Sequence, residues 1–107
     1  MDRYTALADP TRRRIVEMLA AGGILSASDI AAPFDISAPA ISQHLKILRE
    51  ADILRMEKKG QQRLYSMNAQ SLAEMEGWLA EMRRFWTQRL DTLETLLKAD
   101  DSQEKTK

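Results

Sequence analysis

The sequence predicts a mainly α-helical domain with one small β-hairpin and a long C-terminal helix. Three stretches lead to this prediction. Residues 37–51 carry apolar side chains at helical spacing, and residues 53–67 contain two strand-like runs around a glycine turn. Residues 71–98 keep an apolar spacing of three and four throughout, which predicts one continuous helix.

The chain of 107 residues is long enough for one domain, which we expect over residues 1–100, with a disordered polar tail at residues 101–107. Its 44% hydrophobic and 30% charged content is typical of a soluble globular protein. No apolar run is long enough to span a membrane, and the first residues do not resemble a signal peptide. Because there is no cysteine, disulfides and thiolate sites are excluded, and we expect a cytoplasmic protein.

Charge is unevenly distributed although the net charge is zero. Residues 36–65 hold six lysines and arginines against three acidic residues, a net of +3. Residues 66–101 hold four lysines and arginines against seven acidic residues, a net of −3. The middle of the chain is therefore the part suited to face a polyanion such as nucleic acid.

The first segments predict two helices. Residues 2–8 form a short helix, and Asp9 and Pro10 are favoured at the N-cap and first position of the next one. That second helix should run to about Ala21 and end at Gly22–Gly23. Its inward residues are predicted to be Ile15, Met18 and Leu19. The arginines at its start, Arg12 to Arg14, are expected to form a solvated face, with phosphate contact as the alternative, because basic residues at a helix N-terminus oppose the dipole.

Ser26 and Asp29 have the spacing of a capping box and predict a third, short helix. Pro33 should end this helix early, with Phe34 still reaching the core. After a short turn, Ser37 is a suitable N-cap for a fourth helix, so the two helices have helix-turn-helix spacing.

The fourth helix has a buried stripe made by Ile41, Leu45 and Leu48. Its N-terminal half presents small neutral groups, among them Ser42 and Gln43, rather than a dense charged surface. Such groups can approach base edges in a DNA major groove and hydrogen-bond to them. An ordinary surface helix is the alternative that this helix alone leaves open.

A hairpin follows, with Ile53–Lys58 and Gln62–Met67 around Lys59-Gly60-Gln61. Asp52 precedes it at a position where a left-handed backbone is often needed, which Asp tolerates better than most residues. A basic hairpin directly after a helix-turn-helix predicts a winged helix, whose tip can contact phosphates or a minor groove.

The last helix is predicted to be ~42 Å long, whereas a domain of this size is roughly 35 Å across. Its apolar stripe is also wider than one contact needs, so we expect its own helices on one side and a second copy on the other. Packing only within the monomer is the alternative. The predicted dimerisation residues are Leu72, Met75, Trp78, Leu79, Met82, Phe85, Trp86, Leu90 and Leu93.

Three segments, Ala6–Leu19, Ile36–Leu54 and Gly60–Asn68, resemble the ArsR-type family of winged-helix bacterial repressors, and the likeness covers nearly the whole chain. The third segment and Trp78–Leu97 are both similar to the branch of this family that has no metal-binding cysteines. Asp52 stands where the family mostly has glycine, and Pro33 is also unusual.

The resemblance implies a homodimer, built from the first and last helices, that represses transcription by binding a short inverted repeat of DNA, often at its own promoter. By position it places DNA contacts on the fourth helix at Ser37, Ala38, Pro39, Ala40, Ser42, Gln43, His44 and Lys46. It places wing contacts at Lys58, Lys59, Gln61, Gln62 and Arg63. From the residues themselves, Gln43 is the candidate for base readout, and Ser42, Lys46, Lys59 and Arg63 are candidates for phosphate contact.

Other functions are less well supported. We expect no metal site and no cofactor, because His44 is the one histidine and a lone imidazole is a poor metal site; a half-buried structural or phosphate-contacting role is expected instead. An enzyme is not expected, because there is no cysteine nucleophile and no glycine-rich phosphate loop, and Ser42 and His44 do not face each other on a helix. Two alternatives remain: a winged helix that binds protein, and a repressor released by a small organic ligand near Trp78, Phe85 and Trp86.

Overall fold

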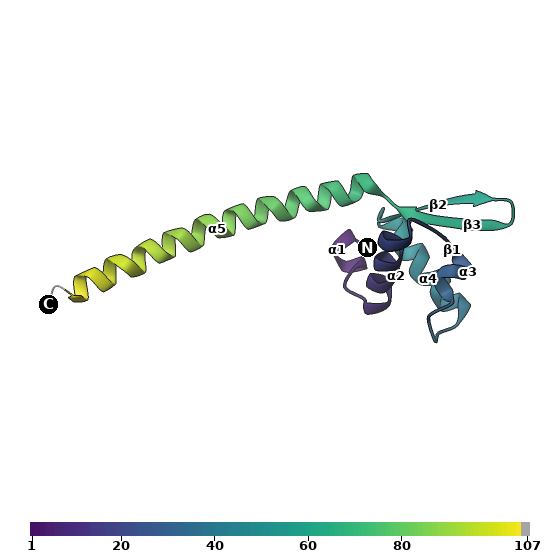
Figure 1. Ribbon diagram of the computed structural model, residues 1–107, viewed down its shortest axis with the longest axis horizontal. Coiled ribbons are helices and arrows are strands. Elements are labelled where there is room, and N and C mark those ends of the chain that lie inside the picture. The colour runs from purple at the N-terminus through teal and green to yellow at the C-terminus, as the bar shows by residue number, and fades with distance from the viewer. Residues whose placement is uncertain (106–107) are drawn as a thin grey trace. The chain divides into compact units, whose positions relative to one another are not determined.

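The computed structural model describes residues 1–105 of the chain, and side chains up to residue 99. The elements in order are α1 (Arg3–Ala6), α2 (Pro10–Gly22), β1 (Ile24–Ser26), α3 (Ala27–Ala31), α4 (Ala38–Glu50), β2 (Leu54–Lys59), β3 (Gln62–Met67) and α5 (Ala69–Lys105). The predicted class, mainly helical with a small hairpin and a long last helix, is confirmed (Figure 1). By internal contacts the chain divides into two compact units, Met1–Leu72 and Ala73–Lys107, where the sequence predicts one domain.

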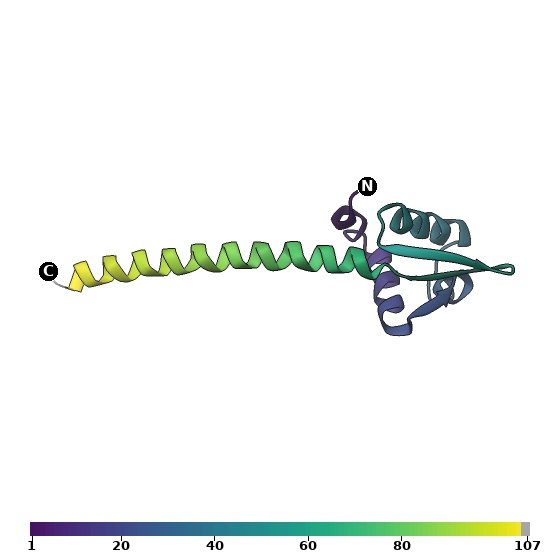
Figure 2. The same cartoon turned by 90° about the horizontal axis from the view of Figure 1, so that it is seen from above.

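The first unit contains a three-stranded antiparallel sheet in the order β1-β3-β2. β2 and β3 pair from Leu54 opposite Met67 to Lys59 opposite Gln62, and both views show their turn extending away from α1 (Figure 1 and Figure 2). β1 was not predicted, because three residues are too few to show an alternating pattern. It pairs with β3 and converts the predicted hairpin into a sheet.

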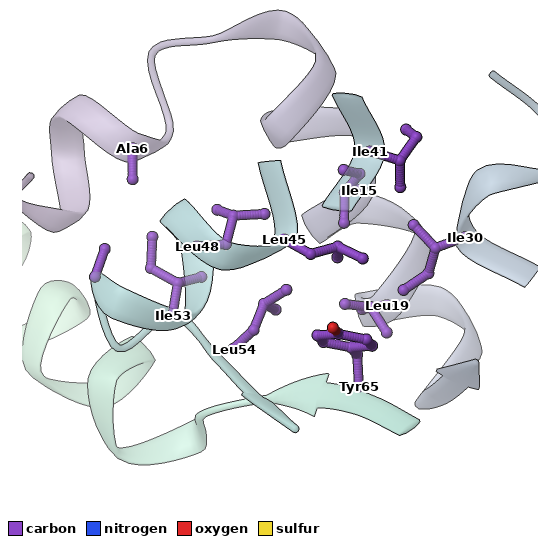
Figure 3. Packing of buried hydrophobic residues seen from close by; sticks show 11 residues of the cluster. Ala6, Ile15, Leu19, Ile30, Ile41, Leu45, Leu48, Ile53, Leu54 and Tyr65 are labelled. Atoms are coloured by element: carbon purple, nitrogen blue, oxygen red, sulfur yellow. The ribbon is translucent and has the colours of Figure 1, made fainter. Parts of the chain in front are cut away.

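The core of this unit lies between the helices and one face of the sheet, where side chains from α2, α4 and the strands point toward one another (Figure 3). The predicted stripe of α4 is buried, and so are Ile15 and Leu19 of α2; Met18 is half-buried. Ile53 and Tyr65 are also buried, and the sequence had not singled them out. Truncating one such side chain to alanine typically costs about 2–5 kcal/mol.

Side-chain caps set the starts of the helices as predicted. Asp9 Oδ2 accepts a hydrogen bond from the Arg12 N–H at 3.0 Å, and Ser37 Oγ accepts one from the Ala40 N–H at 3.2 Å. Ser26 and Asp29 form the capping box of α3, which ends at Ala31, before Pro33. Phe34 is half-buried and packs against the core.

The junction between α4 and β2 is a Schellman motif. The Ile53 N–H donates to the Leu48 carbonyl and the Asp52 N–H donates to the Arg49 carbonyl, each at 3.0 Å. Asp52 has φ of 62°, which confirms the predicted left-handed backbone. Leu48 and Ile53 are both fully buried, so the end of α4 and the start of the hairpin share one apolar contact.

α5 differs from the prediction at its end. The sequence places that end near Lys98, but the helix continues to Lys105, and residues 101–105 are helical where a disordered tail was expected. No glycine or proline interrupts this stretch, so the sequence contains no strong stop signal. Residues 106 and 107 lie outside the described residues. Within the part of the chain that is described, no helix is long and apolar enough to cross a membrane.

Replacing Asp52 with glycine should stabilise the protein. An L-residue at φ of 62° has a steric cost that glycine avoids, so we expect Asp52→Gly to raise the free energy of unfolding by about 0.5–1 kcal/mol in urea titrations. Asp35→Gly is the matched control, because Asp35 has an ordinary φ, and glycine there should only increase the entropy of the unfolded chain. Equal effects of the two substitutions would contradict this account of Asp52.

The cap at Asp9 should give stability that is lost in acid. The N–H of Arg12, together with the charge of its guanidinium, holds the pKa of Asp9 below its ordinary value. As the pH falls, the Asp9 carboxylate is therefore protonated first in the unfolded chain. The stability that the charged cap gives is complete above about pH 5 and is lost as the pH falls through ~3.9 toward the lower pKa of the folded state. Asp9→Ala should lower the free energy of unfolding by ~1 kcal/mol at pH 7. In urea titrations at pH 7 and pH 3.5 this difference should shrink at the lower pH. A constant difference would show that the charge of Asp9 does not contribute.

Candidate nucleic-acid interface

The candidate interface is the face of α4 opposite its buried stripe. Six of the eight predicted contacts on this helix are exposed: Ser37, Ala38, Pro39, Ser42, Gln43 and Lys46. Ala40 is half-buried in the first turn. Because α4 is held on its other side by the core, these side chains, all neutral except Lys46, belong to its solvent-facing surface.

A groove of about 340 Å³ runs between α4 and the sheet. It brings Gln43, Lys46 and Arg63 together, so a residue of the wing lies beside the outer face of the helix. Arg49 also lines the groove, and the sequence analysis had missed it. The signal was present: Ser42, Lys46 and Arg49 follow at spacings of four and three, which places them on one helical face.

All predicted wing residues, Lys58, Lys59, Gln61, Gln62 and Arg63, are exposed at the end of the hairpin. Gly60 has φ of 65° and begins a two-residue turn, as glycine does in type II′ hairpins. Lys58 lies directly opposite Arg63 across the two strands. Like charges at opposed positions destabilise a sheet, so this pair favours a bound anion beside the wing.

Lys46 is the one cation of this face with a described ion pair, to Glu50 at 4.0 Å. Both side chains are exposed and one helical turn apart, so the pair contributes little to stability. Lys46 can therefore exchange this partner for a phosphate oxygen at low cost.

His44 does not share this exposed face. Its side chain is 21% exposed, and Nδ1 lies 3.4 Å from Nη1 of Arg12 and 3.9 Å from Oδ2 of Asp9. The structure thus places His44 against the start of α2, in agreement with the half-buried structural alternative.

The expected solvated face of arginines on α2 is wrong for Arg12. Arg12 is only 9% exposed, and its Nε donates to the Ala6 carbonyl at 2.7 Å. Arg13 Nε donates to the Leu7 carbonyl at 3.2 Å, and the Arg14 guanidinium lies over the Phe34 ring at 5.3 Å. These partners lie outside α2, six or more residues away in the sequence, so the helical pattern of α2 does not show them.

The predicted dimerisation residues lie along α5 and are mostly exposed. Trp86 is 64% and Leu79 54% exposed, and Leu72, Trp78, Phe85, Leu90 and Leu93 are exposed as well. Met82 is half-buried, and Met75, at 7% exposed, is buried in the single chain. Leu96 and Leu97 extend the exposed apolar stripe beyond the predicted set.

Metal-ligating side chains are not clustered in the part of the chain that the structure describes: no three of the histidine and acidic residues there could hold one ion. The expectation that the protein senses no metal stays a prediction.

Comparisons with known proteins agree with this geometry. A family model described as a helix-turn-helix domain matches residues 7–57. The transcriptional repressor SdpR of Bacillus subtilis is 43% identical over 71% of this chain and 83% of its own length. The HTH-type transcriptional regulator Rv2034 of Mycobacterium tuberculosis is 40% identical over 81% of this chain and 78% of its own.

A solved structure, that of the ArsR family transcriptional regulator RHA00566, matches with a TM-score of 0.70 and 34% identity. The match covers 78% of this chain and 84% of that regulator. Its fold corresponds to the helices and sheet described above, and the resemblance to the ArsR-type family is confirmed. The expected branch without metal-binding cysteines stays a prediction. The chain therefore belongs to the ArsR-type family of winged helix-turn-helix proteins and is a DNA-binding transcriptional regulator.

Proposed function

We propose that the protein is a homodimeric repressor that binds an inverted-repeat operator, with α4 of each copy in the major groove and the wing on the adjacent backbone. The observation that carries this proposal is the groove in which Gln43, Lys46, Arg49 and Arg63 meet. It combines a side chain suited to base edges with three cations suited to phosphates.

Base readout is assigned to Gln43. Its amide both donates and accepts, which is the pattern that pairs bidentately with adenine in the major groove. Its small neighbours Pro39 and Ser42 allow the helix to approach the base pairs closely. The cations Lys46, Arg49, Lys59 and Arg63 are assigned to phosphates, where they fix the register without reading the sequence.

The homodimer is supported by the exposed stripe of α5. Leu72, Leu79, Trp86 and Leu93 recur at intervals of seven residues, which is the spacing of a helix that packs along another helix. A two-fold dimer presents two copies of α4 roughly one DNA turn (~34 Å) apart, and this arrangement matches an inverted repeat. Repression, rather than activation, is favoured because the similar protein SdpR is a transcriptional repressor.

We further propose that the protein acts in the cytoplasm, without catalytic activity and without a cofactor. The support is that the similar proteins are named regulators and repressors rather than enzymes. A winged helix that binds another protein is the competing function, and it would show no salt-dependent affinity for DNA.

Removing the amide of Gln43 should reduce specific binding only. We expect Gln43→Ala to weaken operator binding by ~1–3 kcal/mol and to change binding to random DNA little. The operator can be isolated from a random-sequence library or from DNA upstream of the gene, and fluorescence anisotropy gives both affinities. Equal losses on both DNAs would exclude Gln43 from base readout.

Removing a wing cation, unlike removing the amide of Gln43, should reduce binding to DNA of any sequence. Lys59→Ala or Arg63→Ala should weaken operator and random DNA alike, and should reduce the slope of log affinity against log salt by about one. Arg83→Ala is the matched control, because it removes a cation of α5 that lies outside the proposed DNA interface. It should leave the slope unchanged. If neither wing variant changes the slope, the wing does not contact phosphate.

Placing a charge in the stripe of α5 should break the dimer. We expect Trp86→Glu to convert the protein to a monomer in sedimentation velocity experiments at micromolar concentration, because the new carboxylate would lose its hydration in the interface. Operator affinity should fall by about tenfold or more, since the two half-sites would no longer be bound together. Thr95→Glu adds the same charge about 180° away on the helix and should remain dimeric. A dimeric Trp86→Glu variant would contradict the proposed interface.

A further inference from the structure

Three side chains from two helices meet behind the outer face of α4: Asp9 and Arg12 at the start of α2, and His44 of α4. Arg12 is buried and permanently charged, so its guanidinium requires partners in the protein. Nε donates to the Ala6 carbonyl at 2.7 Å, which anchors the group to the end of α1. Nη1 then faces Nδ1 of His44 at 3.4 Å.

The chemistry of this contact selects one form of the imidazole. A guanidinium has only donors, so Nδ1 of His44 must be the acceptor, and the ring is then neutral with its proton on Nε2. The Oδ2 atom of Asp9 lies 3.9 Å from the same nitrogen, beyond hydrogen-bonding distance, and is occupied by the N–H of Arg12. Asp9 thus balances the charge of Arg12 and leaves the acceptor role of His44 intact.

The contact lies one residue from the proposed base reader. His44 is flanked by exposed Gln43 and buried Leu45. Apolar packing at Leu45 determines which face of α4 is buried, and a hydrogen bond at His44 adds a contact with a preferred direction. The side chain at position 44 is therefore where the rotation of α4 about its own axis can be fixed.

We propose that Arg12 is a positioning residue for DNA recognition: held by the Ala6 carbonyl, it donates to Nδ1 of His44 and sets the rotation of α4 that aims Gln43. Arg12 touches no base or phosphate in this role and acts through His44. The inference rests on the proposed function of α4 as the base-reading helix.

The test compares variants of the full-length protein for their discrimination, the ratio of operator affinity to random-DNA affinity. His44→Leu removes the acceptor at similar size and should lower discrimination about tenfold, the scale of one hydrogen bond. His44→Asn restores a neutral oxygen near the position of Nδ1 and should retain discrimination within about twofold of the wild type. Arg12→Lys keeps the charge but loses the planar guanidinium, whose separate nitrogens reach both Ala6 and His44. Its discrimination should therefore fall as in His44→Leu.

Two readouts separate positioning from general stability. Imidazole ¹⁵N chemical shifts should show His44 in the Nε2–H form in the wild-type protein, and thermal unfolding should report the stability of each variant. If Arg12→Lys fails to fold, the pair His44→Leu and His44→Asn decides the question, because His44 is only half-buried.

The proposal is overturned if His44→Leu and His44→Asn discriminate equally well, if operator and random-DNA affinities fall together with stability, or if Nδ1 carries the proton. Gln43→Ala is measured alongside. If it leaves discrimination unchanged, the base-reading role of α4 fails. If it lowers discrimination while His44→Leu does not, only the positioning role of Arg12 fails.

Discussion

The packing of one side of α4 determines the properties of its other side. Ile41, Leu45 and Leu48 are almost completely buried against α2 and the sheet, so the residues half a turn away have to face solvent. Ser37 fixes the start of the helix, and the left-handed turn at Asp52 fixes its end. The exposed face that carries Gln43 is thus a geometric consequence of the core. A substitution that shifts the core can therefore alter DNA binding without touching DNA.

The same core joins the helix to the wing. Ile53 follows the cap of α4 directly, is fully buried, and leads into β2. The strand register then sets Arg63 opposite Lys58 and beside the groove of α4. A flexible linker between helix and hairpin would place these cations over a wide range of distances. The tight connection instead holds the proposed base-reading and phosphate-contacting groups at fixed spacing, which is a requirement for sequence-specific binding.

The features that the sequence predicted correctly depend on nearby residues. The caps at Asp9, Ser26 and Ser37, the stripe of α4 and the turn at Gly60 each involve side chains within a few positions of one another. The features it missed depend on distant partners. β1 exists because β3 pairs with it, and Arg12 is buried because Ala6 and His44 surround it. Of the candidate interface, the exposed residues of α4 and the wing followed from local patterns, whereas the groove required the packing of α4 on the sheet. Arg49 was missed although its helical spacing from Ser42 and Lys46 was a local signal.

The central claim is that α4 of each copy enters a major groove, and methylation interference on a selected operator tests it most directly. Dimethyl sulfate modifies guanine N7 in the major groove and adenine N3 in the minor groove. The account predicts that N7 methylation blocks binding in two symmetric segments about ten base pairs apart, centre to centre. Interference confined to adenine N3, or to a single segment, would contradict the placement of two α4 helices in successive major grooves.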